Sequence, residues 1–295
     1  MAIRAPASLR TIYRILCDPL ILGTSATIAS VTLALWYYSA RRSRSSRILD
    51  QHLAKSFPLV EKIKVNHNTS LYRFALPRST DTLDLPIGQH ISIVAVINGK
   101  EEKRSYTPTT GNDTFGHFDL VIKTYPTGLV SSYMEKLAPG DLVDIQGPNG
   151  AYFYVPNGMR EIGMIAGGSG ITPMLPIIKA ALKNPDDKTK ITLVYANNSL
   201  DDILLKNKLD RLNRQYSDQF RIYYVLIVPP DDWAQGVGYV TKDIVAKWMP
   251  PPSDDIQLLV CGPQPMITDI EQITNELGYN IPKPISKLAD QVFKF

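Results

Sequence analysis

The chain has 295 residues, of which 44% are hydrophobic and 20% are charged. This length and composition allow two folded domains and exclude a disordered protein. There are only two cysteines, Cys17 and Cys261, which argues against a disulfide framework, excludes an iron–sulfur centre and favours a reducing compartment.

The formal charge of +4 is unevenly distributed along the chain. Residues 1–47 contain seven arginines and one acidic residue, so they carry +6 and leave −2 for the other 248 residues. A nearly neutral body has no electrostatic reason to bind a polyanion. We therefore expect no nucleic-acid partner.

An uncharged segment of 22 residues occupies positions 19–40. At 1.5 Å per helical residue, this length is sufficient to cross the roughly 30 Å core of a bilayer. The segment ends in three aromatic residues at 36–38, and arginines follow, which is typical of the end of a membrane span. The sequence predicts an N-terminal tail over 1–18, a transmembrane anchor over 19–40 and a basic linker over 41–55. The arginines favour a cytosolic position for the part of the chain that follows.

Three other interpretations of the N-terminal segment stay open. A cleaved secretory signal normally has a shorter apolar region and a small-residue cleavage site. A mitochondrial presequence fits the first 14 residues, which contain arginines, Ser and Thr but no acidic residue. A buried helix would be separated from the first strand by the polar linker. The expected membrane is that of the endoplasmic reticulum or the outer membrane of the mitochondrion.

The rest of the chain has two halves with different sequence patterns. Over 56–155, short β-rich runs alternate with Gly and Pro, which predicts antiparallel strands in a small barrel. Over 156–295, strand-like and helix-like runs alternate, which predicts a parallel sheet with helices on both faces and a ligand site at the carboxyl ends of its strands. The expected strands of the first half are 60–65, 71–76, 90–97, 118–125 and 141–147. In the second half we expect strands at 162–167, 191–197, 220–228 and 256–262, and helices at 172–183, 201–216, 241–249 and 265–278.

Two segments of the first half contain residues suited to binding a phosphate. The run 104–108 places Arg104, Tyr106 and Thr107 close together, and so combines a cation, an aromatic face and a hydroxyl. Gly128 and Ser131 lie at a turn before a helix, whose N-terminal N–H groups suit a pyrophosphate. Each pattern alone also fits a simpler structure, a surface strand or an N-capping serine.

Two segments of the second half end strands with glycines. Gly167, Gly168 and Gly170 separate a strand from a helix, and glycine lets a dinucleotide or a flavin edge approach the backbone. The spacing is not the standard G-x-G-x-x-G, and a tight strand-to-helix turn would also explain it. Cys261 ends another strand of the same half, where a buried core cysteine is the simpler reading.

Together and in this order, the four segments resemble the NADH-cytochrome b5 reductase family of the ferredoxin-reductase superfamily, in its fungal form. The resemblance covers the 240 residues from Ser56 to Phe295. It implies an FAD-binding β-barrel domain over 56–155 and an NAD-binding α/β domain over 156–295. The implied activity is that of an FAD-dependent oxidoreductase that takes electrons from NADH.

The resemblance assigns the FAD site to the barrel half. Arg104 is expected to pair with the pyrophosphate, Tyr106 to lie against the isoalloxazine ring and Thr107 to bond the flavin. Lys123 and Tyr125 match positions beside the flavin and its adenosine side.

The phosphate-binding turn departs from the family pattern at one point. Gly128 and Ser131 match the turn over the phosphates, but many relatives carry Lys-Met where this chain has Leu129-Val130. One basic contact is therefore absent, and we expect backbone donors and Arg104 to suffice for FAD.

In the second half the resemblance implies a nicotinamide site. The loop formed by Gly167, Gly168, Ser169 and Gly170 is expected to face the nicotinamide and the flavin, with Thr172 near the ring. At the other strand end, Cys261 is expected beside the nicotinamide, with Gly262 and Pro263 shaping the pocket. The candidate catalytic residues are Ser169 and Cys261, because hydride transfer requires the reacting atoms to be held close and aligned. No metal ligands are expected.

The ribose-binding position departs from the family pattern more seriously. In relatives the strand matching 220–228 ends in an aspartate that binds the adenosine ribose, whereas this chain has Ile227 there. Tyr239 fits the aromatic position that flanks the adenine. We predict that NADH binds, with weaker discrimination against NADPH than in relatives that carry the acid.

The electron acceptor is not identified by any residue of this chain. The resemblance implies a haem acceptor such as cytochrome b5, and we expect the reductase to act as a monomer. Two alternatives stay open, namely a quinone or ferric reductase at the membrane and a non-enzymatic membrane scaffold that retains the fold.

Overall fold

The computed structural model describes residues 48–281 and 283–295, and the segment Ile48–Phe295 forms one compact unit. The predicted tail over 1–18, the anchor over 19–40 and residues 41–47 of the linker lie outside the described residues. Among the helices that the structure describes, none is both long enough and apolar enough to span a bilayer.

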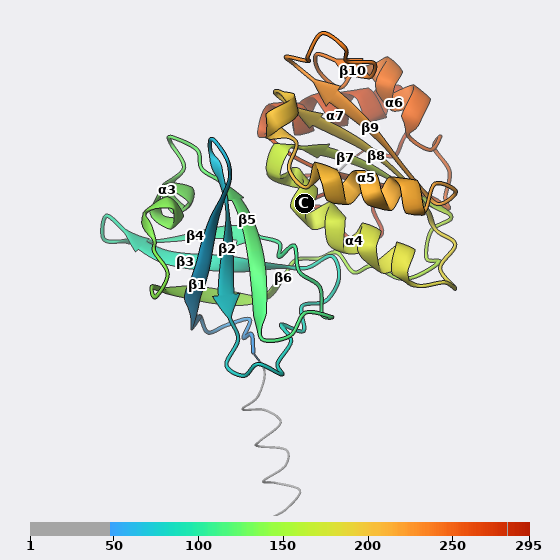
Figure 1. Ribbon diagram of the computed structural model, residues 1–295. Coiled ribbons are helices and arrows are strands. Elements are labelled where there is room, and N and C mark those ends of the chain that lie inside the picture. The colour runs from blue at the N-terminus through green and yellow to red at the C-terminus, as the bar shows by residue number, and fades with distance from the viewer. Residues whose placement is uncertain (1–47, 282) are drawn as a thin grey trace, which may run out of the picture. The chain divides into compact units, whose positions relative to one another are not determined.

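The first half of this unit is an antiparallel, barrel-like sheet, as predicted, and it has six strands where five were expected (Figure 1). Its strands are ordered β4-β3-β6-β1-β2-β5. Successive side chains of strand β3 point to opposite faces of the sheet. Ile91, Ile93 and Ala95 therefore lie in the interior, and their neighbours face outward. The elements are β1 (Lys55–Asn66), β2 (Thr69–Ala75), β3 (His90–Ile97), β4 (Lys100–Tyr106), β5 (His117–Lys123), α3 (Leu129–Lys136) and β6 (Leu142–Asn149).

Aromatic side chains fill the interior of this sheet. Phe118 stacks on Phe74 with ring centroids 5.3 Å apart and meets Phe57 edge-on at 5.5 Å. Helix α3 packs against the same core through the buried Val130 and Met134. Burial of such large apolar groups supplies the main driving force for folding this half.

The second half is a six-stranded parallel sheet, again as predicted (Figure 1). Its order is β10-β9-β8-β7-β11-β12, and each neighbouring pair is parallel. The strands are β7 (Glu161–Gly167), β8 (Lys190–Asn197), β9 (Phe220–Leu226), β10 (Gly236–Val237), β11 (Ile256–Cys261) and β12 (Val292–Lys294). The helices are η1 (Gly168–Gly170), α4 (Ile171–Lys183), η2 (Leu200–Asp202), α5 (Lys206–Gln215), α6 (Lys242–Trp248) and α7 (Gln264–Glu276).

Helices cover both faces of the parallel sheet. Met164 and Ala166 of β7 pack in the cluster that holds α4 and α5, whereas Ile165 packs in the cluster that holds α6 and α7. Figure 1 shows these two pairs of helices on opposite sides of the strands. A strand that is apolar on both faces needs such double cover.

The predicted helix over 201–216 is wrong in its first part. Residues 200–202 form the short helix η2, and α5 begins only at Lys206. Leu205, just before α5, has a positive φ of 60°, a left-handed conformation that interrupts a right-handed helix. The sequence did not predict β4, β10 or β12 either, and β4 was missed because its polar, mostly exposed sequence shows no apolar alternation.

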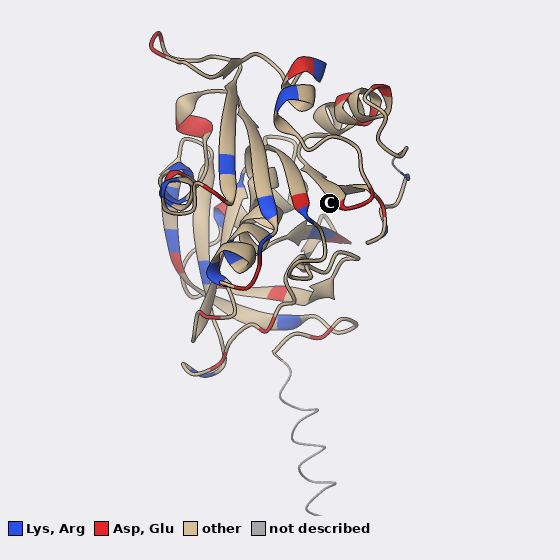
Figure 2. Ribbon diagram, turned by 90° about the vertical axis from the view of Figure 1, so that its right-hand side faces the viewer, with Lys and Arg blue, Asp and Glu red and all other residues tan. Residues whose placement is uncertain are grey.

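Basic and acidic residues are interspersed along the ribbon of both halves (Figure 2). In the barrel, Arg73 donates to both carboxylate oxygens of Asp119 at 2.8 and 3.0 Å and pairs with Glu61 at 2.7 Å. These three residues belong to three neighbouring strands, so the ion pairs join strands across the sheet.

Candidate functional site

The strand order of the parallel sheet marks the position of the site. From β7 the chain continues outward through β8, β9 and β10, and then returns to place β11 on the other side of β7. Loops that leave β7 and β11 therefore diverge to opposite faces, and ligands of open α/β sheets bind in the crevice at this point. Gly167 ends β7 and Cys261 ends β11.

A cavity of about 530 Å³ lies at this edge and is lined by both halves of the unit. Its volume is within the range of small-molecule sites. The barrel contributes Arg104, Tyr106, Thr107, Lys123, Tyr125, Gly128 and Ser131, and the parallel sheet contributes Gly167, Ser169, Gly170, Thr172, Cys261, Gly262 and Pro263. Among the residues predicted for the site, Gly168 and Tyr239 do not line the cavity.

The barrel wall of the cavity carries the cation and the aromatic ring of the 104–108 motif. The guanidinium of Arg104 donates to the carbonyl oxygen of Lys103 at 2.7 Å and pairs with Glu102 at 3.3 Å, and its side chain is 54% exposed. Burial raises the pKa of Tyr106 to about 12, so its phenol stays neutral. The wall thus offers an accessible cation beside a neutral aromatic face.

The N-terminus of α3 forms the next part of the wall. The helix begins at Leu129, so Ser131 lies inside it and not in the turn before it, and no side chain caps its first N–H groups. The hydroxyl of Ser131 donates to the carbonyl of Gly128 at 3.1 Å and accepts from the N–H of Tyr125 at 3.2 Å. Ser131 therefore shapes the turn, and the free helix N–H groups remain available to an anion.

The glycine loop after β7 packs directly against the end of β11. A Cβ atom on Gly170 would lie 2.1 Å from the carbonyl oxygen of Cys261, so any side chain there would separate the two strand ends. Gly168 has a φ of +53°, and its carbonyl accepts a hydrogen bond from Tyr195 at 2.8 Å. These contacts hold a loop of bare backbone at the cavity.

The two candidate catalytic residues lie on this side of the cavity. The hydroxyl of Ser169 is 3.5 Å from that of Tyr125 in the barrel, and its carbonyl accepts a hydrogen bond from Thr172 at 3.0 Å. Desolvation raises the pKa of Cys261 to about 12, so its thiol stays protonated at neutral pH. A protonated thiol is a poor nucleophile but a suitable contact for a flat ring.

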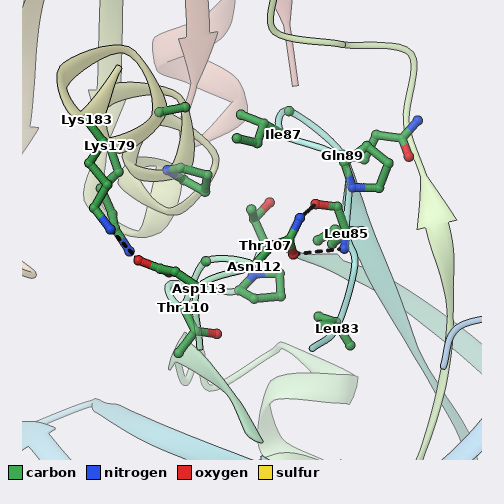
Figure 3. A pocket seen from close by; sticks show the side chains of 16 residues that line it. Leu83, Leu85, Ile87, Gln89, Thr107, Thr110, Asn112, Asp113, Lys179 and Lys183 are labelled. Carbon is green, nitrogen blue, oxygen red and sulfur yellow. Dashed lines mark hydrogen bonds and ion pairs between the residues drawn. The ribbon is translucent and has the colours of Figure 1, made fainter. Parts of the chain in front are cut away.

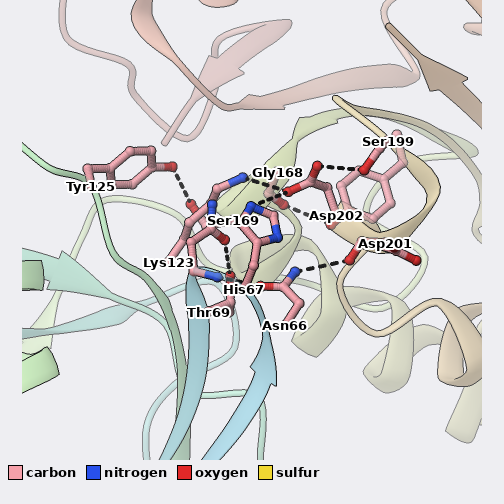
Figure 4. A network of polar contacts seen from close by, with 12 residues as sticks. Asn66, His67, Thr69, Lys123, Tyr125, Gly168, Ser169, Ser199, Asp201 and Asp202 are labelled. Carbon is pink, nitrogen blue, oxygen red and sulfur yellow. Dashed lines mark hydrogen bonds and ion pairs between the residues drawn. The ribbon is translucent and has the colours of Figure 1, made fainter. Parts of the chain in front are cut away.

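Lys123 lies at the cavity wall, but its charge is already compensated (Figure 4). Its ammonium lies 3.1 Å from the carboxylate of Asp202, which belongs to the other half of the unit. Asp202 also accepts a hydrogen bond from Ser199 at 2.8 Å, and the imidazole of His67 lies 4.0 Å away. Asn66 donates to the carbonyl of Asp201 at 3.0 Å beside this pair. The network joins the β1–β2 hairpin and β5 to the segment that follows β8.

Position 227, directly after β9, is where relatives are expected to bind the adenosine ribose through an aspartate. This chain has no carboxylate at that position. Ile227 follows the last residue of this strand and is 41% exposed, with the more exposed Val228 beside it. Tyr239 follows β10 and is 73% exposed. The structure thus leaves apolar side chains uncovered at this strand end.

Sequence reasoning missed several residues of the site, of which three carry chemistry or close the cavity. His90 and Phe295 line the cavity, and burial lowers the pKa of His90, so its imidazole is neutral at neutral pH. Asp202, the partner of Lys123, was also missed. Its position shortly after a parallel strand was the available signal, because the ends of such strands meet at the ligand edge.

The residues around the cavity fit a flavin and a dinucleotide. A flat ring requires an aromatic or apolar wall, a pyrophosphate requires cations or free N–H groups, and a second ring requires bare backbone nearby. Tyr106, Arg104, the N-terminus of α3 and the loop 167–170 provide these features around a single space.

Comparisons with known proteins agree with this geometry. Residues 56–154 match the family described as oxidoreductase FAD-binding domain, and residues 164–272 match that described as oxidoreductase NAD-binding domain. The chain is 49% identical to NADH-cytochrome b5 reductase 1 of Debaryomyces hansenii over 94% of this chain and 97% of the relative. It is 47% identical to the protein of the same name from Scheffersomyces stipitis over 94% and 98% of the two chains.

A solved structure is also similar to this chain over both halves. The cytochrome b5 reductase domain of Ulva prolifera nitrate reductase superposes with a TM-score of 0.77 at 33% identity, covering 85% of this chain and all of that domain. Similarity of this extent covers both halves and the cavity between them. The chain therefore belongs to the NADH-cytochrome b5 reductase family, and it is an FAD-dependent oxidoreductase with FAD and NADH as its cofactors.

Proposed function

We propose that this protein passes electrons from NADH through FAD to cytochrome b5 or a similar haem acceptor, while residues 19–40 hold it on a membrane. The relatives from Debaryomyces and Scheffersomyces are named for cytochrome b5, which supports this choice of acceptor. The observation that carries the proposal is the single cavity in which the 104–108 motif meets the glycine loop 167–170.

The barrel residues bind and orient the flavin in this proposal. The guanidinium of Arg104 and the free N–H groups of α3 neutralise the pyrophosphate, and the neutral ring of Tyr106 packs on the flat ring system. When bound, FAD accepts a hydride and releases electrons singly, which matches a two-electron donor to a one-electron acceptor.

The second half holds the nicotinamide against that ring. Gly167 and Gly170 allow close approach of the backbone, and Cys261 and Pro263 close the opposite side. Ser169 can donate a hydrogen bond at the same wall. These residues contribute proximity and orientation, which alone can lower a transfer barrier by roughly 7–11 kcal/mol.

The membrane assignment is part of the same proposal. Residues 19–40 have the length of a span, and the arginines that follow favour a cytosolic catalytic domain at the endoplasmic reticulum or the mitochondrial outer membrane. An acceptor with its own anchor would share that membrane, which raises the effective concentration of each partner for the other. The chain is proposed to act there as a monomer.

Anaerobic titration of the purified protein tests the donor and the cofactor together. We expect a flavin absorbance spectrum that bleaches with about one equivalent of NADH per flavin, as a two-electron donor requires. A protein without a flavin spectrum after reconstitution with FAD would contradict the proposal and favour the non-enzymatic scaffold.

Steady-state rates with different acceptors test the second half of the reaction. We expect purified cytochrome b5 to be reduced with a higher kcat/KM than a soluble quinone or a ferric chelate. A preference for the quinone or the chelate would assign the protein to the alternative membrane reductases.

A further inference from the structure

A second cavity, of about 220 Å³, lies beside the cofactor cavity, and Figure 3 shows the residues that line it. Two loops of the barrel half and the C-terminal part of α4 enclose it. Thr107 lines both cavities, so the second cavity reaches the back of the 104–108 motif. Neither the proposed function nor the cofactors require this space.

Most of the wall of the second cavity is apolar. Leu83, Leu85 and Ile87 form one side, and Pro176 and Ala180 of α4 form the other. An apolar lining of this kind favours a ligand with an apolar body, because burying that body releases water from both surfaces.

Three polar side chains of the barrel loops already have partners. Asn112 accepts a hydrogen bond from the N–H of Leu85 at 3.2 Å and donates to its carbonyl at 3.0 Å. Thr110 accepts from the N–H of Asp119 at 3.2 Å. Asp113 is paired with Lys183. These bonds fix the loops and leave few polar groups free for a ligand.

Lys179 is different from these residues. It extends from α4 toward Asp113 next to Lys183 (Figure 3), yet it makes no hydrogen bond or ion pair with any residue that the structure describes. Burial lowers its pKa, and the nearby Lys208 and Lys183 lower it further, while Asp113 opposes the shift. A half-buried cation without a partner is costly, and a bound anion would relieve this cost.

We propose that this cavity binds a small organic carboxylate with an apolar body. The carboxylate pairs with the ammonium of Lys179, and the body lies between Ile87 of the barrel and Ala180 of α4. Because these walls belong to different halves of the unit, the ligand bridges them behind Thr107. The site is distinct from the cofactor site and accepts an anion too small to be a dinucleotide.

Fluorine NMR of 4-fluorobenzoate with the full chain in phosphatidylcholine nanodiscs tests the proposal, with empty nanodiscs as the blank. We expect saturable line broadening with 4-fluorobenzoate. The neutral 4-fluorobenzyl alcohol should broaden at least tenfold more weakly at equal concentration, because it cannot form the ion pair. Inorganic phosphate should not displace the benzoate at equal concentration, because it lacks the apolar body.

Variants locate the binding. Lys179→Gln should weaken the binding of 4-fluorobenzoate about tenfold or more. Ala180→Leu should abolish it by filling the space without changing the charge. The matched control Lys188→Gln removes an exposed lysine of the same half outside the cavity and should leave the affinity unchanged.

Several results would overturn the proposal. These are the absence of saturable binding up to millimolar 4-fluorobenzoate, equal binding of the alcohol, displacement by phosphate, or unchanged affinity in Ala180→Leu. Arg104→Gln separates the two cavities, because loss of binding in that variant would move the benzoate to the cofactor cavity. If Lys179→Gln fails to fold, the charge-neutral Ala180→Leu still decides the location.

Discussion

Arg104 must exchange partners to bind a phosphate. Its guanidinium is held by the carbonyl of Lys103 and the carboxylate of Glu102, and the side chain is more than half exposed. Exposed ion pairs of this kind are worth about 0–1 kcal/mol. Charge-assisted hydrogen bonds to a pyrophosphate are stronger, so the exchange is favourable.

Arg104→Gln is therefore expected to weaken FAD binding by about tenfold to a hundredfold, the effect of losing one or two charge-assisted bonds. Flavin fluorescence during titration of the apoprotein measures the affinity. Lys103→Gln removes the adjacent positive charge, which pairs with Glu101 outside the cavity, and should change the affinity less than twofold. Equal losses in the two variants would mean that general electrostatics, rather than a contact of Arg104, holds the cofactor.

Ile227 sets the expected choice between the two nicotinamide donors. Because residues 227–230, directly after β9, include no carboxylate, a 2′-phosphate meets no like charge at that strand end. Ile227→Asp should raise the ratio of kcat/KM for NADH to that for NADPH about tenfold or more, because like-charge contacts cost several kcal/mol. Val228→Asp places the same charge one residue further along the exposed segment and should have a smaller effect. A wild-type preference for NADH of several thousandfold would contradict the idea that discrimination is weak.

Cys261 should be chemically inert at neutral pH. Desolvation raises its pKa to about 12, so the reactive thiolate is rare below that pH. In a Cys17→Ser background, we expect iodoacetamide to modify Cys261 at least tenfold more slowly at pH 7.5 than a free cysteine, with a rate that rises as the pH increases. Mass spectrometry of timed samples measures the rate. Rapid alkylation at pH 7.5 would show that the thiol is exposed and ionised.

At the scale of the elements, the segment between β8 and α5 determines how the two halves meet. An uninterrupted helix over 201–216 would carry Asp202 on its first turn. Instead, Leu205 adopts a left-handed conformation, and η2 leaves the carboxylate of Asp202 beside Lys123. The side chains of Asp202 and Lys123 are only 6% and 14% exposed, so neither charge is well solvated without the other.

Replacing only one of Asp202 and Lys123 should cost more stability, per charge removed, than replacing both. We expect Asp202→Asn and Lys123→Met each to lower the free energy of unfolding by about 3 kcal/mol, because each leaves a largely buried charge unpaired. The double variant should lose clearly less than the sum. Denaturant unfolding measures all three. The exposed pair Lys242–Glu276 is the control and should give less than about 1 kcal/mol in the same cycle.

The contribution of Asp202 should also depend on pH. Desolvation would raise the pKa of its carboxyl, but hydrogen bonds from Ser199 and Lys123 outweigh it and leave the pKa below its usual value. A lowered pKa in the folded state stabilises the protein above the unfolded value of about 3.9 and loses that effect as the pH falls. The stability difference between wild type and Asp202→Asn should be constant from pH 5 to 8 and shrink below about pH 4. A difference that grows on acidification would contradict this sign.

The sequence predicted most of the elements because their signals are local. The apolar alternation of β3 and the apolar run of β7 are visible without any tertiary information. β10 and β12 were not predictable in this way, since two or three residues become a strand only when β9 or β11 lies alongside. The break at Leu205 was missed for a related reason: the burial of Ile203 and Leu204 overrides the helical preference of the segment.

At the scale of the whole chain, the site brings together segments that lie far apart in sequence. Arg104, Gly128, Gly167 and Cys261 line one cavity because two independent sheets present their ends to each other. Each motif alone was ambiguous, and only their order and the family resemblance linked them. Contacts between the halves, such as Lys123 with Asp202, could not be predicted, because spacing within one element carries no information about the opposite domain.

The described unit should function without the N-terminal 47 residues. Residues 48–295 form one compact unit, which contains the three hydrophobic clusters and the cofactor cavity of the described part of the chain. We expect the fragment 48–295 to bleach with NADH as the full chain does, and to reduce a soluble one-electron acceptor such as ferricyanide at an unchanged rate. With cytochrome b5 and reductase reconstituted in the same vesicles, the fragment should be at least tenfold slower than the full chain, because only the anchored protein gains effective concentration from the shared membrane.

Flotation of the vesicles on a density gradient measures the anchoring directly. Equal flotation of the fragment and the full chain would show that residues 1–47 do not provide the anchor, whereas a fragment inactive with ferricyanide would show that they are needed for the catalytic unit itself.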